Sequence, residues 1–314
     1  MLVLSLGAEL LSNERPLVAK YQGQLFFPVV HNPADALLGG RLPTPVDWLD
    51  PVVADRFRVG TGNWVLLAPN GFGPRAIDFN STTLFPSRPD STHWLGTDER
   101  GRDMVAALLY GFRVSALFGL ALTAIGTALG IVAGAVQGYF GGRTDLIGQR
   151  LIEIWSGMPE LYVLIIIVSV FEPSIGLLLL TLSLFGWISL ADYVRAEFLR
   201  NRNLEYVKGA RALGLAPLQV MVRHVLPNSL TPVITFLPFR MGDSMLTLAA
   251  LDFLGLGVGE TMPSLGELLR QGHDNLYAWW ISVPTFLLMV LTFLLLTFIG
   301  NGLRDAYDPR KAWR

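Results

Sequence analysis

Five apolar runs, each about 20 residues long, are the feature that most limits how this chain can fold. A hydrocarbon core about 30 Å thick needs a helix of roughly that length, and lipid leaves no water to satisfy exposed backbone groups. The runs are apolar on all sides, which is typical of helices surrounded by lipid or by other helices. Length therefore identifies them as membrane spans, at about residues 114–139, 151–171, 174–191, 230–256 and 281–303.

The composition agrees with a membrane protein and excludes several other classes. Hydrophobic residues make up 52% of the chain and charged residues 16%, with a mean hydropathy of +0.46. The formal net charge of -1 gives no argument for nucleic-acid binding, and the four histidines have no metal-ligand spacing. No cysteine is present, so a disulfide, a cysteine-ligated metal and a thiol nucleophile are ruled out. We therefore expect an all-α polytopic membrane protein.

The amino-terminal third does not follow the pattern of the rest. Residues 1–11 are apolar but too short to cross a bilayer, and they lack the basic segment of a signal peptide. We interpret them as the remnant of a first transmembrane helix, which brings the expected number of helices to six. Residues 12–103 alternate short apolar runs with many prolines and glycines, which indicates a small folded insert of irregular or β character. Residues 104–314 then form the transmembrane domain.

Small residues mark one face of the first long run. Gly126, Gly130 and Gly134 are spaced four apart, so they share one side of a helix. Such a stripe lets two helix backbones approach closely. We expect this face to pack against another helix.

Basic residues in the short loops predict the orientation in the membrane. Arginine and lysine are frequent in residues 140–150 and 192–227 and in the carboxyl tail, whereas the other short loops contain Arg270 alone. We therefore expect the three basic segments in the cytoplasm, and residues 12–103 on the opposite side.

The segment 205–228, EYVKGARALGLAPLQVMVRHVLPN, is polar and basic although it lies between apolar runs. Its apolar residues at helical spacing predict one short amphipathic helix, and they are Tyr206, Val207, Ala210 and Leu213. Its small residues would let another surface approach closely, and they are Gly209, Ala210, Ala212 and Gly214. From spacing alone, a helix that lies on anionic lipid remains an alternative to a docking element.

This segment resembles the cytoplasmic coupling loop, also called the EAA loop, of binding-protein-dependent ABC importer permeases. The A-x-x-x-G pattern is present at Ala210 and Gly214, and the Leu-Pro pair at residues 226–227. Where that family favours Glu-Ala, this chain has Lys208 and Gly209, and His224 occupies a later apolar position, as the peptide-importer branch allows. The resemblance implies a type I-like importer fold with a coupling loop at about residues 192–228. It also implies that these residues contact the ATPase: Tyr206, Val207, Lys208, Gly209, Ala210, Arg211, Ala212, Leu213, Gly214, Leu226 and Pro227.

Other segments resemble dipeptide and oligopeptide permeases. They are HWLGTDERGRDMVAALLYGFRVSALFGL from His93, LDFLGLGVGETMPSLGELL from Leu251 and LRDAYDPR from Leu303. The insert, with ERPLVAKYQGQLFFPVV, is similar to that of Yej-type permeases, which serve oligopeptides and the peptide antibiotic microcin C. The resemblance implies a subunit of the bacterial inner membrane. It implies as partners a second permease, two ATP-binding subunits, an extracytoplasmic peptide-binding protein, a peptide substrate and membrane lipid.

Familiar hydrolytic motifs are missing from the sequence. It contains no G-x-x-x-x-G-K-[ST], no H-E-x-x-H and no G-x-S-x-G. We therefore expect no catalytic residue and no metal or cofactor bound by this chain, and ATP and magnesium to be used by partner subunits. The resemblance implies a mechanical role, in which closure of the ATPase dimer moves the docked loop and the helices open alternately to each side.

Arg240 and Asp243 lie near the middle of the fourth apolar run. An unpaired charge there costs about 2.5–3.5 kcal/mol on insertion scales, so both must face protein or water. They either line the translocation pathway or neutralise each other as an i,i+3 pair against a neighbouring helix. A second hypothesis for the whole chain, an independent channel or intramembrane enzyme, would use the same two residues as its site.

The run GTDERGRD, residues 96–103, has the acids Asp98, Glu99 and Asp103 interleaved with two arginines. We do not interpret it as an acid/base pair or a metal loop. The glycine, threonine and Asp98 at its start suit a turn and helix cap, and its alternating charges suit an external surface beside the bilayer.

Overall fold

A computed structural model describes residues 1–57, 62–78, 84–257 and 262–307, and most of these residues are helical. The chain separates into two compact units, Met1–Val114 with Glu260–Leu288, and Ser115–Gly259 with Met289–Arg314. Two long helices, α4 (Met104–Phe140) and α13 (Trp279–Ala306), contribute residues to both units. The all-α polytopic fold that the apolar runs predict is confirmed.

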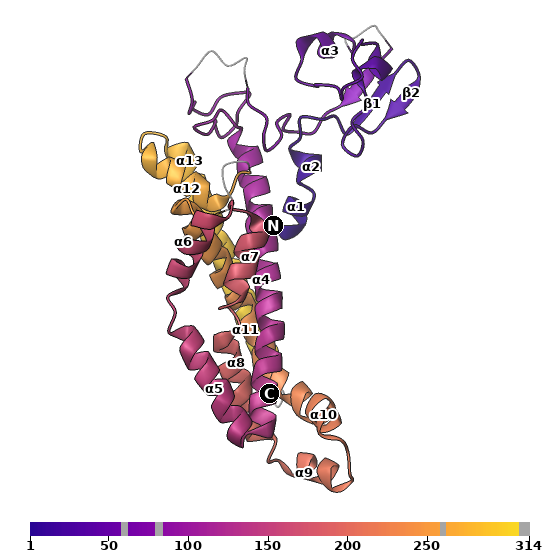
Figure 1. Cartoon of the computed structure of the whole chain (residues 1–314). Helices are drawn as coiled ribbons and strands as arrows, with labels where there is room; N and C mark the ends of the chain where they lie inside the picture. Colours follow the sequence, from indigo (N-terminus) through magenta and orange to yellow (C-terminus); the bar gives the residue numbers. More distant parts are fainter. Residues whose placement is uncertain (58–61, 79–83, 258–261, 308–314) are drawn as a thin grey trace. The chain divides into compact units, whose positions relative to one another are not determined.

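The second unit contains the remaining long helices and several short ones (Figure 1). Besides parts of α4 and α13, its elements are α5 (Gly142–Ser156), α6 (Glu160–Val170), α7 (Ile175–Ser183), α8 (Ile188–Asn201), α9 (Glu205–Ala212), α10 (Pro217–Val220), a π-helical turn η2 (Met221–Val225) and α11 (Leu226–Phe253).

Membrane-spanning potential is concentrated in part of this set. Within the described residues, three helical stretches are long and apolar enough to cross a bilayer: Met104–Phe140, Ile175–Asn201 and Trp279–Ala306. The pair α5 and α6 adds a fourth if it is counted as one span bent by 64°. The sequence predicts one more membrane span, the apolar run at residues 230–256. The corresponding helix α11 is long enough, with 28 residues, but is not among these stretches, because Arg240, Asp243 and Asp252 interrupt its apolar character.

The glycine stripe of α4 packs against α8 and the residues just before it, as expected. A Cβ on Gly126 would lie 2.9 Å from the carbonyl oxygen of Gly186, and one on Gly134 would lie 2.4 Å from that of Ala191. Gly138 continues the stripe, because a Cβ there would lie 2.5 Å from the Cβ of Phe198. Side chains at these positions would separate the helices, so the glycines set how closely α4 and α8 approach.

The first unit contains the β structure that the sequence predicts for residues 12–103. Its sheet has the order β2-β1-β3 and is antiparallel, with β1 at Val18–Tyr21, β2 at Gln24–Phe26 and β3 at Trp64–Leu66. Leu38, Val46 and Val53 form a small core beside it. The unit also contains the short helices α1 (Leu2–Leu6), α2 (Ala8–Leu11), η1 (Asp35–Leu38) and α3 (Pro51–Asp55), and the longer α12 (Leu265–Asp274).

Most of the charged run before α4 is buried, which corrects the surface expected from its alternating charges; of residues 96–103, Glu99 alone is exposed. Asp98, Arg102 and Asp103 have exposed fractions of 0%, 4% and 1%. Arg102 bonds Asp98 through Nε at 2.7 Å and Glu267 of α12 through Nη2 at 3.3 Å. The helix cap is Asp103 rather than the preceding turn, because its Oδ1 accepts from the backbone N–H of Ala106 at 2.9 Å. Paired charges can be buried in this way, whereas unpaired charges cannot.

Candidate functional site

The segment that resembles a coupling loop forms a helical hairpin at one end of the second unit (Figure 1). The predicted amphipathic helix is α9, and it is followed by a turn at Gly214, whose φ is +80°. Pro217 then starts α10, and the chain continues through η2 into α11. Glycine and proline therefore end one helix and begin the next where the sequence predicts it.

One side of α9 is anchored inside the protein. Val207 is fully buried and Ala210 is 6% exposed, and both belong to a core with Phe198 of α8 and Val233 of α11. Arg202, just before α9, donates from Nη1 to the carbonyl oxygens of residues 138 and 139, at 3.1 and 3.2 Å. These contacts fix α9 to helices that continue into the membrane-spanning part of the unit.

The other side of α9 is uncovered. Of the four apolar positions in the predicted stripe, only Val207 and Ala210 are buried, whereas Tyr206 is 42% and Leu213 84% exposed. Leu213 is the C-cap of α9 and lies outside the last helical turn. The exposed surface of α9 and the turn, which we call the α9 outer face, consists of Glu205, Tyr206, Lys208, Gly209, Arg211, Ala212, Leu213 and Gly214. At the start of α11, Leu226 is half-buried and Pro227 is exposed.

Several contacts hold the outer face in place. The guanidinium of Arg211 lies 4.9 Å from the ring centroid of Tyr139, a cation–π distance. Asn228 donates to the hydroxyl of Tyr206 at 2.9 Å. Lys208 donates to the Glu205 carboxylate at 2.9 Å, and this bond holds the pKa of Glu205 below its ordinary value. Gly209 is open, since an added Cβ would meet nothing within 4 Å.

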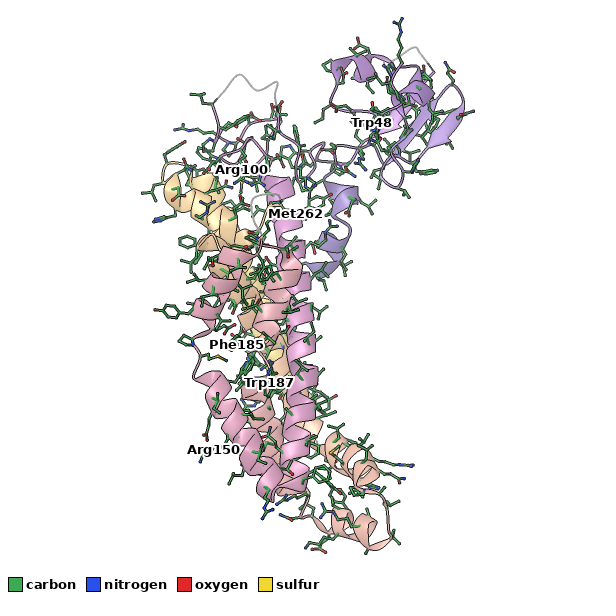
Figure 2. All side chains as sticks on the ribbon, in the orientation of Figure 1. Trp48, Arg100, Arg150, Phe185, Trp187 and Met262 are labelled. Atoms are coloured by element: carbon green, nitrogen blue, oxygen red, sulfur yellow. The ribbon has the colours of Figure 1, made fainter. Side chains whose placement is uncertain are left out.

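Arg240 and Asp243 do not form the i,i+3 ion pair that was one of the two expectations. Among the described residues, Arg240 donates instead to the carbonyl oxygen of Gly186 at 2.5 Å and to Ser189 Oγ at 3.2 Å. These acceptors belong to the junction between α7 and α8, where Phe185 and Trp187 lie (Figure 2). The arginine therefore ties α11 to this junction.

A pocket of about 190 Å³ lies beside Arg240. It is lined by Leu122, Glu160, Leu182, Gly186, Ser189, Arg240, Asp243, Ser244 and Thr247. Glu160 was missed by sequence reasoning, although a carboxylate directly after the break in an apolar run was a visible signal. Within the described ranges, no group of three histidine or acidic side chains is arranged to hold a metal ion.

The charges in this pocket are on an uncovered surface of the chain. Glu160, Ser189 and Asp243 are all exposed in the isolated subunit. Near the middle of a membrane helix, a charge in contact with hydrocarbon costs about 2.5–3.5 kcal/mol on insertion scales, and Arg240 and Asp243 lie near the middle of α11. This surface therefore faces water or another protein rather than lipid.

Comparison with known proteins identifies the family. Residues 126–313 match the family described as "Binding-protein-dependent transport system inner membrane component". The match includes more than half of the 314 residues, and it contains both α9 and most of the pocket beside Arg240. The chain belongs to this permease family. It is accordingly an inner-membrane protein, and the curated relatives that it matches are named as transport permeases rather than enzymes.

Curated relatives match this permease over different shares of its length. It is 47% identical over 309 residues to the "Inner membrane ABC transporter permease protein YejE" of Escherichia coli (strain K12), covering 98% of this chain and 90% of the relative. It is 41% identical to the "Peptidoglycan transport system permease protein YejE" of Agrobacterium fabrum, over 99% of this chain and 87% of the relative. The oligopeptide permease OppC of Haemophilus influenzae is 35% identical over 74% of this chain and 75% of its own length. The Yej-type resemblance is confirmed.

A solved structure supports the fold. The permease resembles a chain of the MetNI methionine ABC transporter in an inward-facing conformation, with a TM-score of 0.56 and 16% sequence identity. The similarity covers 65% of this permease and 98% of that chain. At this level of identity the likeness concerns the fold alone, and the fold is that of an ABC importer transmembrane subunit.

Proposed function

We propose that this permease forms part of the translocation pathway of an ATP-driven peptide importer and couples it to a separate ATPase through residues 204–227. The observation that carries the proposal is the two-sided environment of α9. Its inner side is buried against the helices of its own chain, while its outer face is uncovered and contains the open position Gly209. A helix that is anchored on one side and has small side chains on the other is suited to docking into a partner protein.

The packing of α9 suggests how motion would be transmitted. Val207 and Ala210 share one core with Val225 of η2 and Val233 of α11. Because packed cores move as units, a displacement of the outer face would be carried into α11. The same helix contains Arg240 and Asp243, which we propose line the pathway. Closure of an ATPase dimer would then shift the pathway between its two open states.

The partners follow from the family and from the uncovered surfaces. We propose that a second permease lies against the exposed polar face of the pocket. We also propose two ATP-binding subunits, which use ATP and magnesium and are coupled to this chain through the α9 outer face. The third proposed partner is an extracytoplasmic peptide-binding protein. Peptides are the proposed cargo because permeases named for oligopeptide and dipeptide transport are among the relatives. The α9 outer face would be cytoplasmic, and residues 12–103 extracytoplasmic. That insert would receive the binding protein or pack on the sister subunit.

Cross-linking tests the coupling proposal, and the natural absence of cysteine makes it simple. In the full chain co-expressed with its ATPase, Ala212→Cys introduces a thiol on the α9 outer face. We expect a specific adduct with the ATPase whose yield changes when ATP is added. Ala210→Cys is the matched control, because this position lies two residues away but is only 6% exposed, and it should give no adduct.

The opposite result has a clear meaning. If the thiol introduced at position 212 reacts freely with water-soluble reagents in the assembled membrane and captures no ATPase, α9 is not a docking helix. It would then be a helix lying on the lipid surface, and the proposed coupling would be wrong.

A further inference from the structure

The break between α5 and α6 brings Glu160 to the pocket beside Arg240. Residues 157–159 separate the two helices, and Glu160 is the first residue of α6. Broken membrane helices place charged side chains and helix ends in the interior of transporters, where substrate sites are built. The carboxylate of Glu160 therefore lines the same pocket as Asp243, from a different helix.

The three charges in the pocket are not equivalent. Both terminal nitrogens of Arg240 already donate to the α7–α8 junction, one to Gly186 and one to Ser189. Among the described residues, the carboxylates of Glu160 and Asp243 make no hydrogen bond and no ion pair, although Asp243 acts on Arg240 electrostatically. The pocket therefore presents two available carboxylate acceptors, whereas both terminal nitrogens of Arg240 are engaged within the chain and its Nε is buried without a hydrogen-bond partner among the described residues.

Charge balance indicates the ligand. When both carboxylates are ionised, they and the one guanidinium leave a net charge of -1, which one monovalent cation would neutralise and thereby favour the ionised carboxylates. Charge in the membrane interior is stabilised when it is balanced, so a cationic group is the expected occupant. An ammonium group has three donors and no acceptor, and it matches a site made of carboxylate and hydroxyl oxygens. Ser244 and Thr247 supply further oxygens to the lining.

We propose that Glu160 and Asp243 bind the amino-terminal ammonium group of the peptide as it passes through the permease. The site rests on the proposed function, because it needs a peptide in the pathway. Arg240 acts in it as a positioning residue, since its bonds to Gly186 and Ser189 hold α11, and with it Asp243, beside the pocket that Glu160 also lines.

The test compares two peptides that differ only in this group. The permease is reconstituted in liposomes with its sister permease, its ATPases and its binding protein. Uptake driven by ATP is then measured for a labelled tri-alanine peptide with a free amino terminus and for the same peptide acetylated there. The binding protein can also discriminate between them, so the readout is the change in their uptake ratio between the wild type and each variant.

Neutralising either carboxylate should remove this preference. We expect Glu160→Gln and Asp243→Asn each to lower uptake of the free peptide on the order of tenfold by raising KM, because a charge-assisted hydrogen bond is lost. Uptake of the acetylated peptide should be unchanged. Glu160→Asp keeps the charge and should retain most of the preference. Because neutralisation removes a charge from the membrane interior, neither variant is expected to misfold.

Glu153→Gln is the matched control, since this exposed carboxylate of α5 pairs with Arg150 and does not line the pocket. An unchanged uptake ratio in both neutralised variants would overturn the ammonium site. If the wild-type complex transports neither peptide, the proposed peptide transport itself fails. The two failures are therefore distinguishable.

Discussion

The glycine stripe of α4 gives a residue-scale prediction about stability. Gly134→Ala would place a Cβ 2.4 Å from the carbonyl oxygen of Ala191. Because this oxygen belongs to the backbone, the clash can be relieved only if the backbone moves. Overpacking of this kind typically costs about 1–3 kcal/mol. We expect a lower thermal midpoint for the purified permease. Gly176→Ala in α7 is the control, because its Cβ would meet nothing within 4 Å, and it should leave stability unchanged or slightly raised. Equal midpoints in the two variants would contradict the prediction.

Glu267 of α12 makes the stability of the first unit depend on pH. Burial raises the pKa of Glu267 above its ordinary value of 4.5, and Arg102 and Arg100 only partly oppose this effect. A raised pKa means that the folded state holds the proton more tightly than the unfolded state. This stabilisation is fully present below pH 4.5 and is lost as pH rises through the raised pKa. We expect the thermal midpoint to fall as pH increases from 4.5 toward neutral.

The two acids of the first unit that have the opposite pKa shift do not obscure this pH window. Hydrogen bonds lower the pKa of Asp35 and Asp90 below 3.8, so the stability that they contribute is present throughout the range above that value. Thermal unfolding across the pH range is therefore compared for the wild type, Glu267→Gln and the exposed control Glu99→Gln. The slope should disappear in Glu267→Gln alone. A slope that survives this substitution would assign the effect to another group.

At the scale of elements, a substitution in α9 can test coupling to the ATPase without disturbing the fold of the permease. Gly209→Trp adds a large side chain where the chain itself leaves open space, so the fold should be retained. The same side chain would block a docked partner. We expect an unchanged thermal midpoint together with loss of peptide-stimulated ATP hydrolysis in the reconstituted complex. Gly209→Ala, which adds one methyl group and favours the helix, should keep most of the activity. Normal hydrolysis with Gly209→Trp would exclude this face as the docking surface.

Local pattern was sufficient to predict α9 and the glycine contacts of α4. The helix at residues 205–212 follows from the spacing of its apolar residues and from the glycine and proline that follow it. The close helix contact at Gly126, Gly130 and Gly134 follows from their four-residue spacing, which places them on one face of a helix. Which apolar residues of α9 are buried was not predictable, because Val207 is covered by α8 and α11, and no pattern within α9 reveals where those helices pack.

Long-range contacts explain the remaining errors. The run at residues 96–103 looks like a solvated surface because alternating charges usually are one. It is buried because Glu267, more than 160 residues later, supplies a partner for Arg102. Likewise, Arg240 and Asp243 have the spacing of a local pair, but the acceptors at Gly186 and Ser189 compete successfully for the arginine. No single-helix pattern contains these partners.

At the scale of the whole molecule, the relatives match different shares of the chain. The family match starts at residue 126, so residues before it, including the sheet, lie outside the matched range. The YejE relatives nevertheless match 98% and 99% of the chain, whereas the OppC relative matches 74%. The chain is therefore similar to the YejE relatives over nearly its full length and to the OppC relative over about three quarters of it, while the family match itself is confined to residues 126–313.

Orientation in the membrane is the last prediction, and it concerns the entire chain. Basic residues cluster around α9 and in the tail, so these parts should be cytoplasmic and the sheet-containing insert outside. Because the chain has no cysteine, Ser91→Cys and Leu213→Cys each introduce a single thiol, and both positions are exposed. A membrane-impermeant maleimide should label the Ser91→Cys variant in sealed right-side-out vesicles, and the Leu213→Cys variant only after the membrane is permeabilised. Labelling of the Leu213→Cys variant in sealed vesicles would reverse the orientation, and it would remove the α9 outer face from the side on which an ATPase can use cytoplasmic ATP.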